Sequence, residues 1–72
     1  MKIIIERFDQ INLNSDDWNI EALNNDKGEI RYTAKTSTRM SIRRGKNEHY
    51  YNCGKETILY CFGDMVHAHI TE

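Results

Sequence analysis

The stretch "RYTAKTSTRMSIRR", residues 31–44, alternates between two kinds of side chain. Its even positions from Tyr32 to Ile42 are uncharged, and its odd positions hold a row of positive charge, which we call the basic row: Arg31, Lys35, Arg39 and Arg43. Because successive side chains of a β-strand point to opposite faces, this alternation predicts extended chain with one face toward a core and one basic face. We expect two strands here, with a break or bend near Thr36 and Ser37.

The segment before this stretch has the composition of a hairpin loop. Gly28 in "NDKGE" fits the left-handed position that follows a type I turn. The register set by such a loop opposes Ala22 to Tyr32 and Ile20 to Ala34. Apolar residues then lie on one face of both strands, which a slip of one residue would destroy.

The hairpin reading favours a strand over residues 15–24. Alternate positions from Trp18 onward are apolar, as in a half-buried strand. The alternative is a short helix, because Asn14 or Ser15 could cap it and two aspartates would lie in its first turn.

A second hairpin is predicted in "ETILYCFGDMVHAHIT", where Gly63 and Asp64 form a two-residue turn. The turn pairs Leu59 with Ala68 and Cys61 with Val66. One face of this hairpin is the expected core side: Leu59, Cys61, Val66, Ala68 and Ile70. The other, which we call the aromatic–histidine face, either packs on a second sheet or meets a partner: Ile58, Tyr60, Phe62, Met65, His67 and His69.

These segments predict a mainly β protein, either a small antiparallel sheet or a partly open barrel of five to seven strands. An α+β fold with one short helix near residues 15–24 is the alternative. We expect one small domain, residues 1–72, because the chain has no proline and only four glycines to form a linker. A chain of this size buries only about 60% of its unfolded surface, so its core is thin. The piece "RRGKNEH" is expected to be a turn.

Charge is unevenly distributed along the chain. Residues 31–55 hold seven of the ten basic groups, and the acidic groups lie almost entirely outside them. The net charge is nevertheless −1 and the isoelectric point about 6.3, well below the basic range usual for nucleic-acid-binding domains. This balance indicates a dipolar surface.

The basic row, with two further cations beyond it, is the expected binding surface: Arg31, Lys35, Arg39, Arg43, Arg44 and Lys46. Alternate strand residues lie about 6.6–7 Å apart, a spacing comparable to that of phosphates along a nucleic-acid strand. Tyr50, Tyr51 or Tyr60 could stack on bases. Three interpretations stay open: a solvated strand face, contact with an acidic protein surface, and binding of single-stranded nucleic acid.

No catalytic or cofactor motif is present, and we expect neither an enzyme nor a bound metal or cofactor. His67 and His69 share a strand face, but a closed zinc site needs four ligands, and Cys61 points the other way. Cys53 with His49 is the one local nucleophile candidate, and nothing marks an oxyanion hole beside it. Two cysteines are too few for a disulfide framework; a single bridge is the alternative to two reduced thiols.

In size, composition and missing motifs, the chain resembles the small accessory proteins of phages and other mobile elements, anti-CRISPR proteins among them. The resemblance implies a non-enzymatic inhibitor that covers the acidic surface of a larger host nucleic-acid-processing or defence enzyme through its basic strand face. The alternative function is a β-barrel that binds single-stranded nucleic acid. A homo-oligomer that buries the aromatic–histidine face is a third hypothesis.

The chain is expected to be cytoplasmic, as a monomer or a homodimer. The opening "MKIIIERF" contains too few consecutive apolar residues for a signal peptide, and no apolar run approaches the length of a membrane span. We therefore expect no membrane partner.

Overall fold

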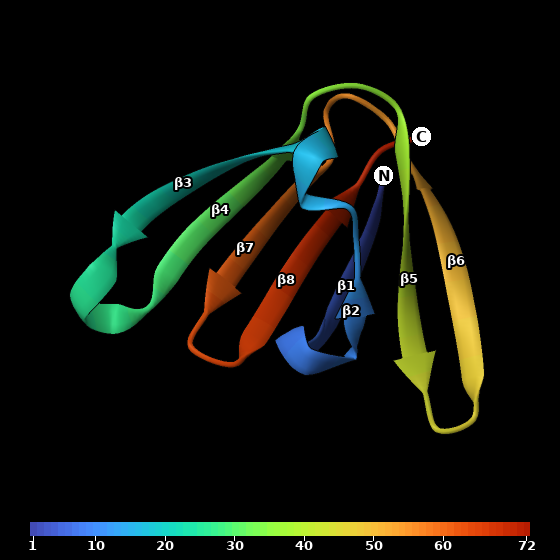
Figure 1. Cartoon of the computed structure of the whole chain (residues 1–72), viewed down its shortest axis with the longest axis horizontal. Helices are drawn as coiled ribbons and strands as arrows, with labels where there is room; N and C mark the ends of the chain where they lie inside the picture. Colours follow the sequence, from blue (N-terminus) through green and yellow to red (C-terminus); the bar gives the residue numbers. More distant parts are fainter.

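The computed structural model describes residues 1–72 and consists of eight β-strands joined by short turns (Figure 1). The larger sheet has five antiparallel strands in the order β1 (Lys2–Arg7), β8 (Met65–Ile70), β7 (Ile58–Phe62), β4 (Glu29–Ala34) and β3 (Trp18–Asn24). The smaller sheet has three, in the order β2 (Ile11–Asn12), β5 (Thr38–Arg44) and β6 (Asn47–Cys53). The mainly β prediction is confirmed, although the expected number of strands was too low.

Most of residues 15–24 form a strand, so the helical alternative is not needed. A 3₁₀ turn, η2 (Ser15–Asp17), precedes the strand, and the side chain of Asn14 caps it by accepting a hydrogen bond from the amide of Asp16 at 3.2 Å. The chain then extends as β3 from Trp18. The capping signal was therefore real, but it starts a single turn and not a helix.

The β3–β4 hairpin confirms the predicted conformation of Gly28, whose φ of 65° is left-handed. The predicted register was wrong by two residues, because Ile20 opposes Tyr32 and Ala22 opposes Ile30. A bulge between Ala22 and Asn24 and the 3₁₀ turn η3 (Asn25–Lys27) take up the extra length. A shift of two residues keeps every side chain on its expected face.

The β7–β8 hairpin has the predicted register, with Leu59 opposite Ala68 and Cys61 opposite Val66. Its expected core side is confirmed as part of one buried apolar cluster. The cluster also draws on β3, β4, β5 and β6, and its members are Trp18, Ala34, Met40, Ile42, Cys53, Leu59, Cys61, Val66, Ala68 and Ile70. Both cysteines are free thiols in this cluster.

The chain crosses repeatedly between the two sheets. It leaves the larger sheet after β1 and again after β4, where the expected bend near Thr36 and Ser37 separates β4 from β5. The segment "RRGKNEH" is mostly strand and not turn, because β5 and β6 extend to a two-residue connection at Gly45 and Lys46. Gly45 has a φ of 64°, which suits a tight hairpin.

A buried polar residue, Thr57, ties several strand ends together. Its hydroxyl donates to the carbonyl of Thr71 at 3.0 Å and accepts from the amide of Thr71 at 3.0 Å. Its carbonyl accepts a hydrogen bond from the amide of Ala34 at 3.2 Å, and its amide donates to the carbonyl of Gly54 at 3.0 Å. The ends of β4, β6 and β8 are thereby fixed beside the start of β7.

Candidate interaction surfaces

The basic row is divided between the two sheets. Arg31 lies on the outer face of β4 in the larger sheet, whereas Arg39 and Arg43 lie on the outer face of β5 in the smaller one. The sheets pack with their inner faces together, so the two outer faces point away from each other. The expectation of one continuous charged strand face was therefore wrong: the bend at residues 35–37 transfers the chain between sheets and separates Arg31 from the other arginines.

Two of the candidate cations form ion pairs within the protein. Arg31 pairs with Glu21 of the neighbouring strand β3. The Nε atom of Arg44 lies 3.0 Å from Oε2 of Glu6, and its Nη1 atom donates to the hydroxyl of Tyr51 at 3.3 Å. These hydrogen bonds to Tyr51 and Glu6 raise the pKa of Arg44 above its ordinary value. Neither charge is fully available to an acidic partner.

The remaining cations, Lys35, Arg39, Arg43 and Lys46, are exposed. The guanidinium of Arg39 lies 4.9 Å from the centroid of the Tyr50 ring, a cation–π contact. Tyr50 also donates its hydroxyl hydrogen bond to Glu48 at 3.0 Å, which raises the pKa of the phenol. Glu48 itself opposes Arg43 in the register. The outer face of the smaller sheet is thus a mixed surface, with an acidic group among its cations.

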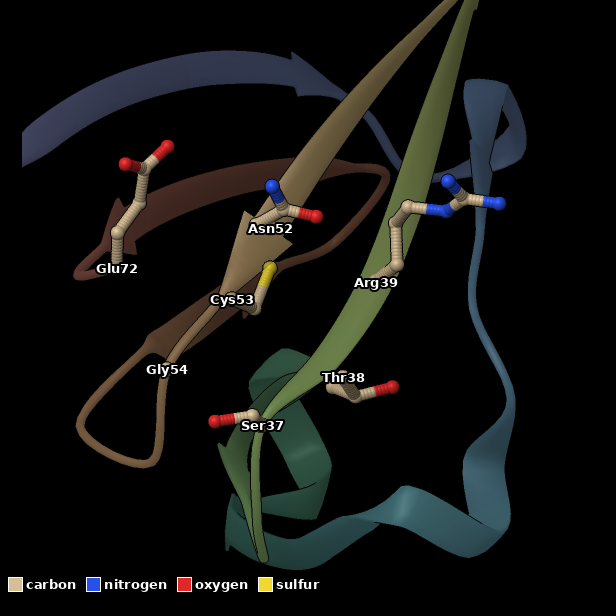
Figure 2. A pocket seen from close by; sticks show the side chains of 7 residues that line it. All are labelled: Ser37, Thr38, Arg39, Asn52, Cys53, Gly54 and Glu72. Carbon is tan, nitrogen blue, oxygen red and sulfur yellow. The ribbon is translucent and has the colours of Figure 1, made fainter.

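Arg39 also lines a polar cleft of about 450 Å³ at the open end of the β5–β6 hairpin (Figure 2). In Figure 2, Arg39 and Glu72 lie on opposite sides of the cleft, with Cys53 between them. The complete lining is Ser37, Thr38, Arg39, Asn52, Cys53, Gly54 and Glu72. Burial raises the pKa of the Cys53 thiol, whereas a nucleophilic cysteine needs a lowered one. His49, the residue considered as its base, is exposed on β6.

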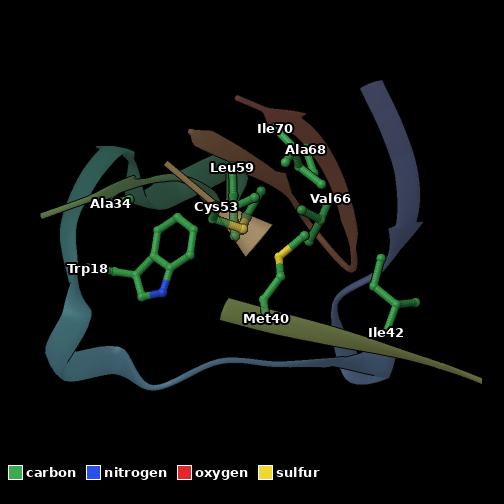
Figure 3. Packing of buried hydrophobic residues seen from close by; sticks show 10 residues of the cluster. Trp18, Ala34, Met40, Ile42, Cys53, Leu59, Val66, Ala68 and Ile70 are labelled. Atoms are coloured by element: carbon green, nitrogen blue, oxygen red, sulfur yellow. The ribbon is translucent and has the colours of Figure 1, made fainter. Parts of the chain in front are cut away.

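The aromatic–histidine face is the outer face of the larger sheet. The smaller sheet packs on the opposite face, where Met40 and Ile42 of β5 belong to the same buried cluster as Val66 and Leu59 (Figure 3). The aromatic and imidazole rings of the outer face contact one another. Phe62 meets His67 edge to face at 5.5 Å between centroids, and Tyr60 meets His69 in the same way at 5.5 Å. The sequence left two possibilities for this face, packing on a second sheet or contact with a partner. The structure excludes packing on the second sheet.

Strand β1 extends this face in a way that sequence reasoning missed. β1 pairs with β8 so that Ile3 opposes His69 and Ile5 opposes His67. The side chains of Ile3 and Ile5 are 62% and 57% exposed, and that of Phe62 is 43% exposed. The aromatic–histidine face together with Ile3 and Ile5 is called the outer apolar face below. The run "IIIE" was the available signal, because isoleucines on both parities cannot all point inward.

The histidines of this face do not form a metal centre with other side chains. Cys61 lies in the core on the inner face, as its parity predicted. No group of three or more His, Cys, Asp or Glu side chains is arranged to hold a metal ion. The imidazole rings of His67 and His69 instead pack against the rings of Phe62 and Tyr60, respectively.

The chain matches no described protein family, and no curated protein or solved structure is significantly similar to it. No helix of the structure has the length and apolar character needed to cross a membrane. Inferences about function therefore rest on the surfaces just described.

Proposed function

We propose that the chain is a protein-binding module that docks through its outer apolar face. The observation that carries this proposal is the exposure of Ile3 and Ile5 on β1 and of Phe62 on β7, on either side of β8 and all on one uncovered sheet face. Single exposed apolar residues are common on soluble proteins, whereas contiguous apolar patches are typical of interaction sites.

The composition of the face supports a protein partner. Its centre holds aromatic, methionine and isoleucine side chains and no carboxylate, lysine or arginine, as expected for the core of a protein interface. Charged groups of both signs lie at its margins: Arg7 at the end of β1, and Glu29 and Arg31 on β4. An apolar centre inside a polar rim is the usual anatomy of a protein interface.

Two matched double variants test the proposal. Ile5→Lys with Phe62→Lys places charge in the centre of the outer apolar face. Arg39→Glu with Arg43→Glu reverses charge on the outer face of the smaller sheet. Each tagged protein is used to capture partners from a lysate of the source cells, followed by mass spectrometry. We expect the first variant to lose the partner that the wild-type chain captures and the second to retain it.

Folding is the required control for both variants. All four positions have exposed side chains, and substitutions at such positions usually change the free energy of unfolding by about 0.5 kcal/mol or less. Circular dichroism spectra and melting temperatures close to wild type are therefore expected. Loss of the partner only in the Arg39 and Arg43 variant would contradict the proposal and return the binding site to the basic row.

The finer expectation, an inhibitor of a host nucleic-acid-processing or defence enzyme, stays a prediction. The captured partner decides it: if the partner is an enzyme, its activity is measured with increasing amounts of the wild-type chain and of the two variants. Inhibition that the Ile5 and Phe62 variant no longer produces would support it. The anti-CRISPR-like role predicts in addition that the partner acts on nucleic acid.

A second candidate function, binding of single-stranded nucleic acid, is favoured by one observation. Arg39 and Tyr50 form a stacked pair on the outer face of the smaller sheet, with Arg43 on the same strand face. Such a pair combines a stacking surface with positive charge. Gel shifts with mixed oligonucleotides across a salt series test it, because phosphate-driven binding weakens steeply with salt. Binding that Arg39→Glu leaves unchanged would contradict this function.

A further inference from the structure

Strand β3 is a free edge of the larger sheet. It pairs with β4 on one side, and no strand lies on its other side (Figure 1). Natural edge strands are usually protected by shortness, by charged residues, by proline or by a bulge. The bulge of β3 lies at its last residues, between Ala22 and Asn24, so the stretch from Trp18 to Ala22 pairs regularly. β3 is seven residues long and contains neither lysine, arginine nor proline. Its one charged residue, Glu21, is already paired with Arg31.

The other edges are better protected. β2 has only two residues. β1 carries Lys2, Glu6 and Arg7 among its six residues. β6 begins with a run of polar residues at positions 47–49. By the rules that govern edge pairing, β3 is the edge most open to another strand.

The hydrogen bonds of β4 show which backbone groups of β3 face outward. The amide of Lys35 donates to the carbonyl of Asp17, whereas the amide of Ala34 donates to Thr57 on the other side of β4. The backbone amides and carbonyls of successive residues in a strand point toward opposite neighbouring strands. Those of the odd residues of β3 therefore bond to β4, and those of the even residues point to the free edge. Ile20 and Ala22 therefore present an amide and a carbonyl each, and Trp18 presents its carbonyl while its amide bonds to Ser15.

Uncovered apolar side chains lie beside these backbone groups. Ile20 is 53% exposed on the inner face of the sheet, opposite Tyr32. Phe8, also partly exposed, lies 6.1 Å from Tyr32 between ring centroids. In Figure 1, β3 and the turn after it extend away from β5 and β6, so the smaller sheet does not cover this end.

We propose that β3 pairs antiparallel with β3 of a second copy of the chain, about a twofold axis at Ile20. The amide of Ile20 then donates to the carbonyl of Ile20 in the second copy, and the reverse. The amide of Ala22 donates to the carbonyl of Trp18 in the second copy. The two larger sheets become one continuous sheet, and the Ile20 side chains of both copies meet on its inner face.

Charge selects this register over its neighbours. With the twofold axis at Glu21, the carboxylates of Glu21 in the two copies lie opposite each other. With the axis at Asn19, Asp17 of one copy lies opposite Glu21 of the other. Like charges directly opposite each other destabilise a sheet. An axis at Ile20 instead places Asn19 opposite Glu21, and the asparagine amide can donate a hydrogen bond to that carboxylate.

Sedimentation velocity of the full chain, from about 1 µM to about 1 mM, tests self-association in the affinity range of modest interfaces. We expect the wild type to show a reversible monomer–dimer equilibrium. Ala22→Pro removes an outward-facing amide, and proline is tolerated on an edge strand where that amide faces solvent. Because each dimer loses two hydrogen bonds, its dissociation constant should rise at least about tenfold.

A matched pair of variants tests the register. Asn19→Lys opposes Glu21 of the second copy and should tighten the dimer in a salt-dependent way. Asn19→Glu places two carboxylates opposite each other and should weaken it. Both substitutions lie at an exposed position, which keeps the test valid even if Ala22→Pro disturbs folding. Phe62→Lys, on the outer apolar face, should leave the dimer unchanged.

Three results would overturn the inference. The first is a wild-type chain that stays monomeric at about 1 mM. The second is a dimer that Phe62→Lys abolishes and Ala22→Pro does not, which would assign self-association to the outer apolar face. The third is an equal effect of Asn19→Lys and Asn19→Glu. Because the outer apolar face stays free in the proposed dimer, these outcomes are independent of the partner-capture experiment.

Discussion

The two faces of the β7–β8 hairpin are both apolar, and only one of them is covered. On the inner face Leu59 and Val66 are 1% and 0% exposed, beneath the smaller sheet. On the outer face Phe62 keeps 43% of its surface exposed, although it lies one residue from the buried Cys61. The alternation of side chains defines the two faces, but the crossing of β2, β5 and β6 to one side decides which becomes the core.

The largest difference between the faces is expected for Leu59→Ala. Removing this buried side chain should lower the free energy of unfolding by about 2–5 kcal/mol, close to the whole stability of so small a protein. Urea denaturation followed by circular dichroism measures it, with Tyr60→Ala on the outer face as the matched control. Equal decreases in the free energy of unfolding for Leu59→Ala and Tyr60→Ala would contradict the distinction between a covered and an uncovered face.

A smaller loss is expected from Thr57→Val, which keeps the shape of a buried side chain and removes its hydroxyl. The amide of Thr71 would lose its partner, whereas its carbonyl would keep the hydrogen bond from the amide of Gly54. A buried polar group without a partner costs about 1–3 kcal/mol. Urea denaturation of Thr57→Val and Thr57→Ser separates the contribution of the hydroxyl, which valine lacks, from that of the methyl group, which serine lacks. Serine should retain most of the stability, and a valine variant as stable as wild type would contradict the role of the hydroxyl.

The thiols of the inner face should make stability depend on pH. Burial raises the pKa of both Cys53 and Cys61 above the ordinary value of 9.0. Above that pH the unfolded chain loses thiol protons that the folded chain keeps, so the contribution of the two thiols to stability is constant below about pH 9 and falls as the pH rises further. Urea midpoints from pH 7 to pH 11 measure this, and Cys61→Ala should make the fall shallower. A rise in stability over the same range would contradict it.

The smallest effect is expected from Phe62→Lys on the outer apolar face. An exposed substitution there should change the free energy of unfolding by about 0.5 kcal/mol or less. Thermal denaturation beside Leu59→Ala sharpens the contrast between a covered and an uncovered apolar residue. A loss comparable with that of Leu59→Ala would mean that the outer face is already buried in an assembly of the chain.

Local signals predicted the hairpins well. The two-residue turn at Gly63 and Asp64 fixes the register of β7 and β8, and every pair followed from it. The turn at Gly28 was recognised with the same rules, but the register failed, because nothing in the residues around Leu23 marks a bulge. Turn chemistry is local, whereas a bulge depends on how the strand must twist against its neighbours.

The candidate surfaces were harder to predict because they depend on tertiary arrangement. Arg31 and Arg39 share parity along the chain, and only the transfer of the chain from one sheet to the other separates them. The aromatic–histidine face was found from β7 and β8 alone. Its extension by Ile3 and Ile5 requires the pairing of β1 with β8, which no local pattern encodes.

The pairing of β1 with β8 also sets the order in which the sheet can form. Lys2 opposes Ile70, so β1 leaves the ribosome well before β8, its only strand partner. Proteins dominated by such long-range pairings fold in milliseconds to seconds, slower than helical bundles of similar size. Until β8 is synthesised, the three isoleucines of β1 have no strand to pair with and are open to chaperones or to other nascent chains.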